Sequence, residues 1–357
     1  MDTKVFDVRE IINDKQALET ALRNAADMLA YGGTVAFPTE TVYGLGANAF
    51  DEAAVKKVFE AKGRPSDNPL IIHIADMSQL KGLVKSVPER ALRLMESFWP
   101  GPLSIIMEKE DRIPDCVTAG LGTAAVRMPE NPEAYVLLKL AGCPVAAPSA
   151  NLSGKPSPTK PEHVLHDLDG RVSGIVLGRT CDVGIESTVI DMSTDSPVIL
   201  RPGIIIKEDI EAVIGPVRLA SRKNSSESVP KAPGMKYTHY APDAPMILFE
   251  GSPSEMLSKI LGRASEELAS GKKVGIIATD ETLDLYEKSP VLSGAGSICI
   301  LSTGSRKDLK TVAHNIFHIL RRFDEENVDI ILSEAFEAEG IGFSVMNRMD
   351  KAAGEKK

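Results

Sequence analysis

The apolar positions of the chain alternate between helical and strand-like spacing, which predicts an α/β protein. After Asp14, a good helix cap, apolar residues recur at helical spacing through Leu29. A short apolar run at 34–37 follows, and Pro38 ends it. Further strand-like runs lie at 70–74, 103–107, 123–128, 145–147, 174–177, 187–192 and 198–200. Six or more strands separated by helices over residues 1 to about 206 indicate one α/β domain.

The same alternation restarts after residue 245. Strand-like runs lie at 247–249, 274–278, 298–301 and 330–332, with helical patterns at 256–268 and 305–323. Strands and helices that alternate in this way predict a small parallel, doubly wound second domain. We therefore divide the chain into a first domain at 1–215, a linker at 216–245 and a second domain at 246–357.

Composition and charge place the chain among ordinary globular proteins. It is 43% hydrophobic and 25% charged, with a net charge of −9 that argues against a constitutive nucleic-acid or anionic-membrane surface. The four cysteines are far apart and form no CxxC pair, so we expect reduced thiols. No apolar run is long enough to span a bilayer, and none at the N-terminus suggests a signal peptide. A soluble cytoplasmic protein is expected.

The richest stretch for chemistry is KGRPSDNPLIIH at 62–73. Lys62 and Arg64 stand two apart in a stiff Gly/Pro corner, a combination that suits polyphosphate. Asn68 adds an amide that can donate and accept. A solvated helix end is the simpler interpretation, but here the cations lead into a turn and a strand, where functional loops usually sit.

Three other segments offer polar groups at strand ends. Residues 39–46, TETVYGLG, form a ligand loop or a plain turn. The segment 144–159, PVAAPSANLSGKPSPT, follows a short strand and favours a preorganised binding loop over a surface linker. Arg127, near the end of a strand, could clamp a carboxylate or form an ordinary salt bridge.

Several common catalytic signatures are missing. The sequence contains no G-x-x-x-x-G-K-[ST], H-E-x-x-H or G-x-S-x-G motif. The G-x-G-x-x-A pattern at 44–49 is discounted because Pro38 separates it from the preceding strand. We interpret His314 and His318 as half-buried helix histidines, and His163 and His166 as surface residues.

The linker has an unusual composition. Its run PKAPGMKYTHYAP, at 230–242, carries Tyr237, His239 and Tyr240. Flexible tethers rarely contain so many aromatic side chains, so we expect this segment to pack on other residues.

Together these motifs resemble the YrdC-like threonylcarbamoyl-adenylate synthase family, in its longer two-domain form. The resemblance rests on PTETVYGLG at 38–46, KGRPSDNPLIIHI at 62–74, WPGPLS at 99–104, VRMP at 126–129, PSANLSGKPSPT at 148–159, ESTVID at 186–191 and LRPG at 200–203. The tail GIGFSVMNRMDKAA at 340–353 resembles the end of the family's second domain. The resemblance implies a twisted mixed sheet with flanking helices, followed by a smaller Rossmann-like parallel α/β domain.

The resemblance also implies a reaction. Such an enzyme joins L-threonine, bicarbonate and ATP into threonylcarbamoyl-adenylate and pyrophosphate, with Mg²⁺ on the triphosphate. Downstream tRNA threonylcarbamoyl-transferase proteins would then modify the adenosine next to the anticodon. Neither stable nucleic-acid binding by this chain nor a membrane partner is expected.

Site residues are implied in the same way. L-Threonine would lie against Thr41, His73, Arg127, Ala147 and Ser187, with Arg127 on its carboxylate and only the main chain of Ala147 available for a polar contact. ATP would be held by Lys62, Arg64, Asn68, Thr123, Ser149, Asn151, Ser157 and Arg201, with Tyr240 reaching it from the linker. No metal ligand among the side chains is implied.

Two other functions compete. A related fold could serve as a non-catalytic module that binds double-stranded RNA by shape, but the acidic balance, His73 and Arg127 disfavour it. Carbamoyl transfer, as in hydrogenase maturation proteins with a related domain, comes with zinc-finger-like cysteine motifs that this sequence lacks.

Overall fold

A computed structural model describes residues 2–220, 240–292, 297–353 and 355–356. The chain forms two compact units: Met1–Ser153 with Ser157–Tyr237, and Gly154–Pro156 with Thr238–Lys357. Each is described by itself below. Most of the predicted linker, including Tyr237 and His239, lies outside the described residues, and Tyr240 lies within them.

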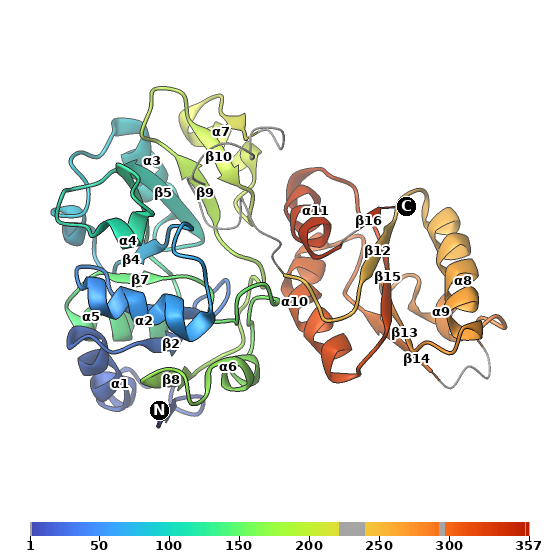
Figure 1. Cartoon of the computed structure of the whole chain (residues 1–357). Coiled ribbons are helices and arrows are strands. Elements are labelled where there is room, and N and C mark those ends of the chain that lie inside the picture. The colour runs from blue at the N-terminus through green and yellow to red at the C-terminus, as the bar shows by residue number, and fades with distance from the viewer. Residues whose placement is uncertain (1, 221–239, 293–296, 354, 357) are drawn as a thin grey trace. The chain divides into compact units, whose positions relative to one another are not determined.

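The first unit is built on one mixed sheet of eleven strands (Figure 1). The strand order is β1-β8-β2-β3-β7-β4-β6-β5-β9-β10-β11. The strands are β1 (Lys4–Asp7), β2 (Val35–Phe37), β3 (Gly44–Asn48), β4 (Ile71–His73), β5 (Leu103–Glu108), β6 (Thr123–Arg127), β7 (Val145–Ala147), β8 (Gly174–Leu177), β9 (Thr188–Asp191), β10 (Val198–Arg201) and β11 (Arg218–Leu219). The twisted mixed sheet expected from the sequence is confirmed.

Helices flank this sheet. They are α1 (Lys15–Ala30), α2 (Glu52–Lys62), α3 (Glu89–Phe98), α4 (Asp115–Thr118), α5 (Pro132–Ala141), α6 (Pro161–Leu168) and α7 (Lys207–Ile214), with a 3₁₀ turn at Met77–Leu80. Asp14 caps α1 by accepting from the amides of Gln16 and Ala17, as its sequence position predicts. Gly63 ends α2 in the left-handed conformation (φ 61°), which places the cationic corner directly after the helix.

The glycine segment at 44–48 differs from expectation. The sequence favours a loop there, whereas Gly44–Asn48 forms β3, antiparallel to β2 and β7. Close packing explains the glycine within this strand: a Cβ added to Gly46 would come within 2.5 Å of Val145 Cγ1 and 2.8 Å of Phe37 Cε1. Glycine is needed here because a neighbouring strand lies close to the backbone.

One histidine is also misassigned. His163 is buried, whereas the sequence suggests a surface position. Its Nδ1 accepts hydrogen bonds from the amides of Thr159 and Lys160, at the start of α6. Satisfying these amides compensates for burying the ring, a use that helical periodicity does not reveal.

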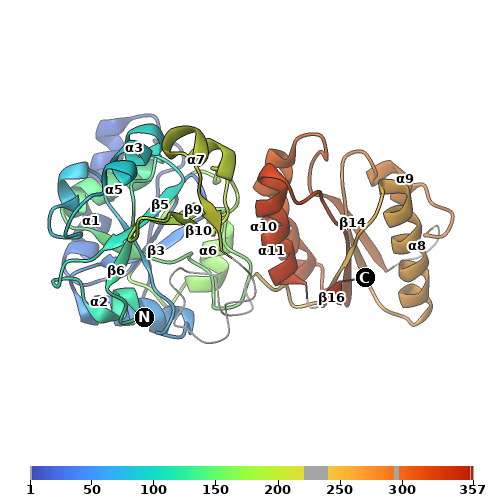
Figure 2. The same cartoon turned by 90° about the horizontal axis from the view of Figure 1, so that it is seen from above.

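The second unit is a doubly wound parallel sheet, as predicted. Its strands are β12 (Met246–Phe249), β13 (Val274–Ala278), β14 (Ile298–Ser302), β15 (Ile330–Glu334) and β16 (Glu355–Lys356), in the order β14-β13-β15-β12-β16. All pairs are parallel. Helices α8 (Pro253–Ala269) and α9 (Leu283–Glu287) cover one face, and α10 (Leu309–Glu325) and α11 (Gly340–Ala352) cover the other (Figures 1 and 2).

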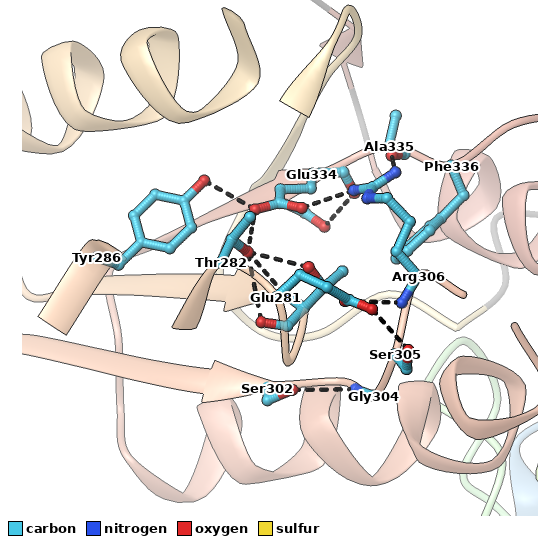
Figure 3. A network of polar contacts seen from close by, with 12 residues as sticks. Glu281, Thr282, Tyr286, Ser302, Gly304, Ser305, Arg306, Glu334, Ala335 and Phe336 are labelled. Carbon is cyan, nitrogen blue, oxygen red and sulfur yellow. Dashed lines mark hydrogen bonds and ion pairs between the residues drawn. The ribbon is translucent and has the colours of Figure 1, made fainter. Parts of the chain in front are cut away.

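A polar network closes the carboxyl edge of this second sheet (Figure 3). The fully buried Glu334, at the end of β15, accepts hydrogen bonds from Thr282 Oγ1 (2.6 Å) and Tyr286 OH (3.0 Å). Its other oxygen lies 2.6 Å from Arg306 Nη2. Both carboxylate oxygens are therefore paired within the network, which ties the loops after β13, β14 and β15 together.

Candidate functional site

Two of the predicted site residues end neighbouring strands at one edge of the large sheet. His73 and Arg127 end the parallel strands β4 and β6 and are direct register partners. The starts of β5 and β9 lie at the same edge, because β5 runs antiparallel to β6 and parallel to β9. Side chains 54 positions apart in the sequence therefore become neighbours through strand pairing.

Arg127 is buried and held from several sides. Its Nη1 donates to Thr41 Oγ1 over 2.9 Å, and its Nε donates to the Gly101 carbonyl oxygen over 3.3 Å. Its Nη2 lies 2.6 Å from Glu40 Oε1. The loop at 39–41 thus delivers a hydroxyl and a carboxylate to one guanidinium, which makes this loop part of the site.

His73 is a neutral group in this environment. Its Nδ1 lies 3.1 Å from the Ile71 carbonyl oxygen, and its ring packs edge-on against Phe37 at a centroid distance of 6.2 Å. Burial, followed by the positive charge of Arg127, lowers the His73 pKa to about 3. The imidazole can therefore pack and hydrogen-bond at neutral pH without adding charge.

A second polar group surrounds the start of β9. Ser187 Oγ lies 2.8 Å from Ser104 Oγ on β5 and accepts a hydrogen bond from Arg201 Nη2 over 3.0 Å. Arg201 Nε also donates to the Ser187 carbonyl oxygen. Glu186, the residue before Ser187, accepts a hydrogen bond from Ser157 Oγ over 2.6 Å. This group joins Ser187, predicted to contact threonine, to Ser157 and Arg201, predicted to contact ATP.

Lys62 points into the serine-rich loop after β7. It is buried, and its Nζ donates to the carbonyl oxygens of Ser149 (2.5 Å) and Asn151. Asn151 Oδ1, 3.4 Å from the ammonium, also accepts from Ser149 Oγ. The ammonium therefore holds two residues of this loop, Ser149 and Asn151, whose contacts with ATP stay predictions.

The other cation of the corner lies closer to the turn that follows. Arg64 Nη2 is 3.3 Å from the Asn68 carbonyl oxygen and 3.4 Å from that of Pro69. Among the described residues, the buried Asn68 Oδ1 has no hydrogen-bond partner. Such an acceptor is a candidate ligand contact.

The segment at 39–44 connects the two halves of the site. Thr41 contacts Arg127, and two residues later the Tyr43 carbonyl oxygen accepts from the Ala150 amide over 2.8 Å. The Tyr43 amide donates to the Pro158 carbonyl oxygen over 2.9 Å. The segment at 39–44 therefore contacts both Arg127 and the serine-rich loop after β7.

Three other predicted ligand residues, Ala147, Thr123 and Tyr240, lie on β7, on β6 and in the second unit. Ala147 ends β7 opposite Ile71, within the same part of the sheet. Thr123 starts β6, four residues and roughly 13 Å of strand from Arg127. Tyr240 belongs to the second unit, where its ring lies 4.9 Å from that of Phe317 on α10. Their ligand roles stay predictions.

Two buried carboxylates were not among the predicted site residues. Glu40 contacts Arg127, and Glu186 accepts from Ser157. The sequence offers a weak signal for both, since each is an acidic residue followed directly by a hydroxyl residue near a strand boundary. Nothing in that local pattern shows which cation or hydroxyl each would meet.

The described part of the chain contains no group of three or more His, Cys, Asp or Glu side chains placed to hold a metal ion. In the same residues, no helix combines the length and apolar character needed to cross a membrane.

Comparison with known proteins gives two family matches. Residues 27–203 match the family described as telomere recombination (Sua5_yciO_yrdC). Residues 205–354 match the threonylcarbamoyl-AMP synthase C-terminal domain. Together they span both units.

Similar full-length proteins are also known. The chain is 50% identical to threonylcarbamoyl-AMP synthase of Bacillus subtilis over 99% of both chains. It is 46% identical to that of Pyrococcus abyssi over 96% of this chain and 97% of the relative. A solved structure of Pyrococcus abyssi Sua5 complexed with L-threonine matches with a TM-score of 0.90 and 45% identity, over 99% of this chain and 100% of that one.

Proposed function

Because this chain belongs to the threonylcarbamoyl-AMP synthase family, we propose that it joins L-threonine, bicarbonate and ATP into threonylcarbamoyl-AMP and pyrophosphate. Membership makes it a nucleotidyltransferase-type enzyme that serves tRNA modification. One observation carries the detailed proposal. Residues 39–44 contact both the buried Arg127 and the serine-rich loop at 148–159.

The threonine half rests on Arg127. A planar guanidinium matches a carboxylate in shape and charge, and the hydrogen bond to Thr41 helps to orient the Arg127 guanidinium. Neutral His73 and the hydroxyl of Ser187 would face the remainder of the amino acid, with the main chain of Ala147 beside them. A relative that shares this fold was solved as a complex with L-threonine, which supports L-threonine as a ligand of this chain.

The nucleotide half rests on the corner after α2 and the serine-rich loop. Arg64, the Asn68 amide and Arg201 would contact the nucleotide, with Ser149, Asn151, Ser157 and Thr123 as neutral partners. Lys62 would act largely by fixing the loop that carries Ser149 and Asn151. Tyr240 remains a proposed contact from the linker.

The chemistry needs alignment and charge neutralisation. After its ammonium group loses a proton, the threonine amine condenses with bicarbonate to give a carbamate and water, and the carbamate oxygen attacks the α-phosphorus and expels pyrophosphate. We propose that Mg²⁺ enters as the ATP complex, because this ion usually binds through substrate phosphates and keeps several of its waters. Downstream tRNA threonylcarbamoyl-transferase proteins would consume the product, and a cytoplasmic location stays a prediction.

The test is release of pyrophosphate by the purified full chain, with each substrate omitted in turn. We expect release only when L-threonine, bicarbonate and ATP are all present, and a product that carries both threonine and AMP. Equal release without threonine would overturn the proposal, and so would a product without the threonyl group.

A further inference from the structure

The Glu40–Arg127 pair combines close contact with incomplete hydrogen bonding. Glu40 Oε1 lies 2.6 Å from Arg127 Nη2, and the two side chains are 7% and 4% exposed. Yet, among the described residues, neither Glu40 oxygen accepts a properly aligned hydrogen bond and Arg127 Nη2 donates none. Buried charges are costly unless their hydrogen bonds are satisfied, so this pair is arranged for more than stability.

Two titratable side chains near the pair, His73 and Cys181, add no charge to it. Burial keeps His73 neutral and raises the pKa of the Cys181 thiol well above its ordinary value, so the thiol is also uncharged at neutral pH. The loop that carries Glu40 is anchored, because the Glu40 carbonyl oxygen accepts from the Val183 amide over 2.8 Å. The Glu40 carboxylate and the Arg127 guanidinium thus form a fixed, buried dipole.

An α-amino acid carries the complementary dipole. Its carboxylate and ammonium are attached to the same carbon, so a ligand carboxylate on Arg127 brings the ammonium next to the guanidinium's own anionic partner. In a low-dielectric site such matched charges attract strongly. The ammonium has three N–H donors and can donate to the two Glu40 oxygens, which accept no aligned hydrogen bond from the described residues.

We propose that Glu40 is the acceptor for the α-ammonium group and that, with Arg127, it restricts the site to zwitterionic α-amino acids. This inference rests on the proposed function, because it assigns the amino acid to the Arg127 clamp. Without ligand, Glu40 balances the charge of Arg127. With the amino acid bound, each member of the pair gains the hydrogen bonds that it lacks.

The experiment compares two ligands by calorimetry on the full chain. One is L-threonine, and the other is its 2-hydroxy analogue, 2,3-dihydroxybutanoate of the same configuration. The wild type should bind L-threonine more tightly than the analogue, on the order of 10- to 100-fold, the range expected for a hydrogen bond to a charged group. Glu40→Gln should weaken threonine binding and bring the two affinities within about threefold of each other.

The matched control is Glu133→Gln. Glu133 is also buried beside an arginine, 3.1 Å from Arg179 Nε, but it lies outside the proposed site. This variant should lose stability and keep the preference for L-threonine. Loss of preference in both variants would make the effect at Glu40 a general consequence of removing a buried charge, which overturns the proposal.

Other outcomes are also decisive. Glu40→Gln with an unchanged preference would reduce Glu40 to a structural partner of Arg127. If that variant does not fold, equal wild-type affinity for the amino acid and the hydroxy acid overturns the inference by itself. A wild type that forms the adenylate but does not discriminate refutes only this inference, whereas a wild type that neither binds threonine nor forms the adenylate refutes the proposed function as well.

Discussion

Lys62 Nζ lies 2.5 Å from the Ser149 carbonyl oxygen, and this hydrogen bond joins the end of α2 to the loop after β7. Because the same ammonium also serves Asn151, Lys62→Met should leave more than one buried carbonyl unsatisfied. We expect the free energy of unfolding to fall by about 1–3 kcal/mol and the KM for ATP to rise. Chemical denaturation and steady-state kinetics measure the two effects.

Lys57 provides the control for this variant. It lies on the same helix, is exposed, and donates to the Gly32 carbonyl oxygen over 2.8 Å. Lys57→Met should change stability little and leave both KM values unaltered. Wild-type kinetics in Lys62→Met would remove Lys62 from the site.

Arg127→Lys should impair threonine use more than ATP use. Lysine keeps the charge but loses the planar fork that contacts Thr41 and matches a carboxylate. We expect the KM for L-threonine to rise on the order of tenfold or more, with a much smaller change for ATP. Initial rates at varied concentrations of each substrate test this, and a defect confined to ATP would place Arg127 in the wrong half of the site.

Arg201 should affect both substrates. It is predicted to bind ATP, yet its Nε and Nη2 donate to the Ser187 carbonyl oxygen and hydroxyl, on the proposed threonine side. Arg201→Lys should therefore raise the KM for ATP and for threonine together. Ser187→Ala should raise mainly the KM for threonine. If Arg201→Lys alters only one KM, the hydrogen-bonded group around β9 does not link the two halves.

Acid should weaken the second unit through Glu281. Partial desolvation opposes ionisation of this carboxyl, but hydrogen bonds from the Ser305 hydroxyl and the amides of Arg306 and Lys307 outweigh it and lower its pKa to about 2 (Figure 3). A depressed folded-state pKa contributes stability above the ordinary value of 4.5, and this stability is lost as pH falls toward 2.

The comparison is Glu281→Gln against Glu287→Gln, an exposed position on α9. Thermal unfolding between about pH 5 and about pH 2 should show a shallower loss of stability in Glu281→Gln than in the wild type. Glu287→Gln should follow the wild type. Identical pH profiles for Glu281→Gln and the wild type would mean that the carboxylate contributes nothing to this loop.

Much of the local structure was determined by the sequence itself. Asp14 and Gly63 mark helix ends because capping and left-handed geometry depend on a few adjacent residues. Short apolar runs identify β4, β6 and β7 because buried strands need apolar side chains on both faces. The doubly wound second unit follows from its alternating pattern for the same reason.

The contacts of the site were decided only by the tertiary structure. Glu40 and Arg127 are 87 positions apart, and their pairing depends on how β2, β3 and β6 are placed in one sheet. Likewise, position 46 requires glycine because the Val145 and Phe37 side chains leave no room for a Cβ, and Lys62 meets the loop at 149–151 only through the packing of α2. Local spacing specifies which residues can form an element, but sheet order and register determine which side chains meet, and they arise from long-range packing.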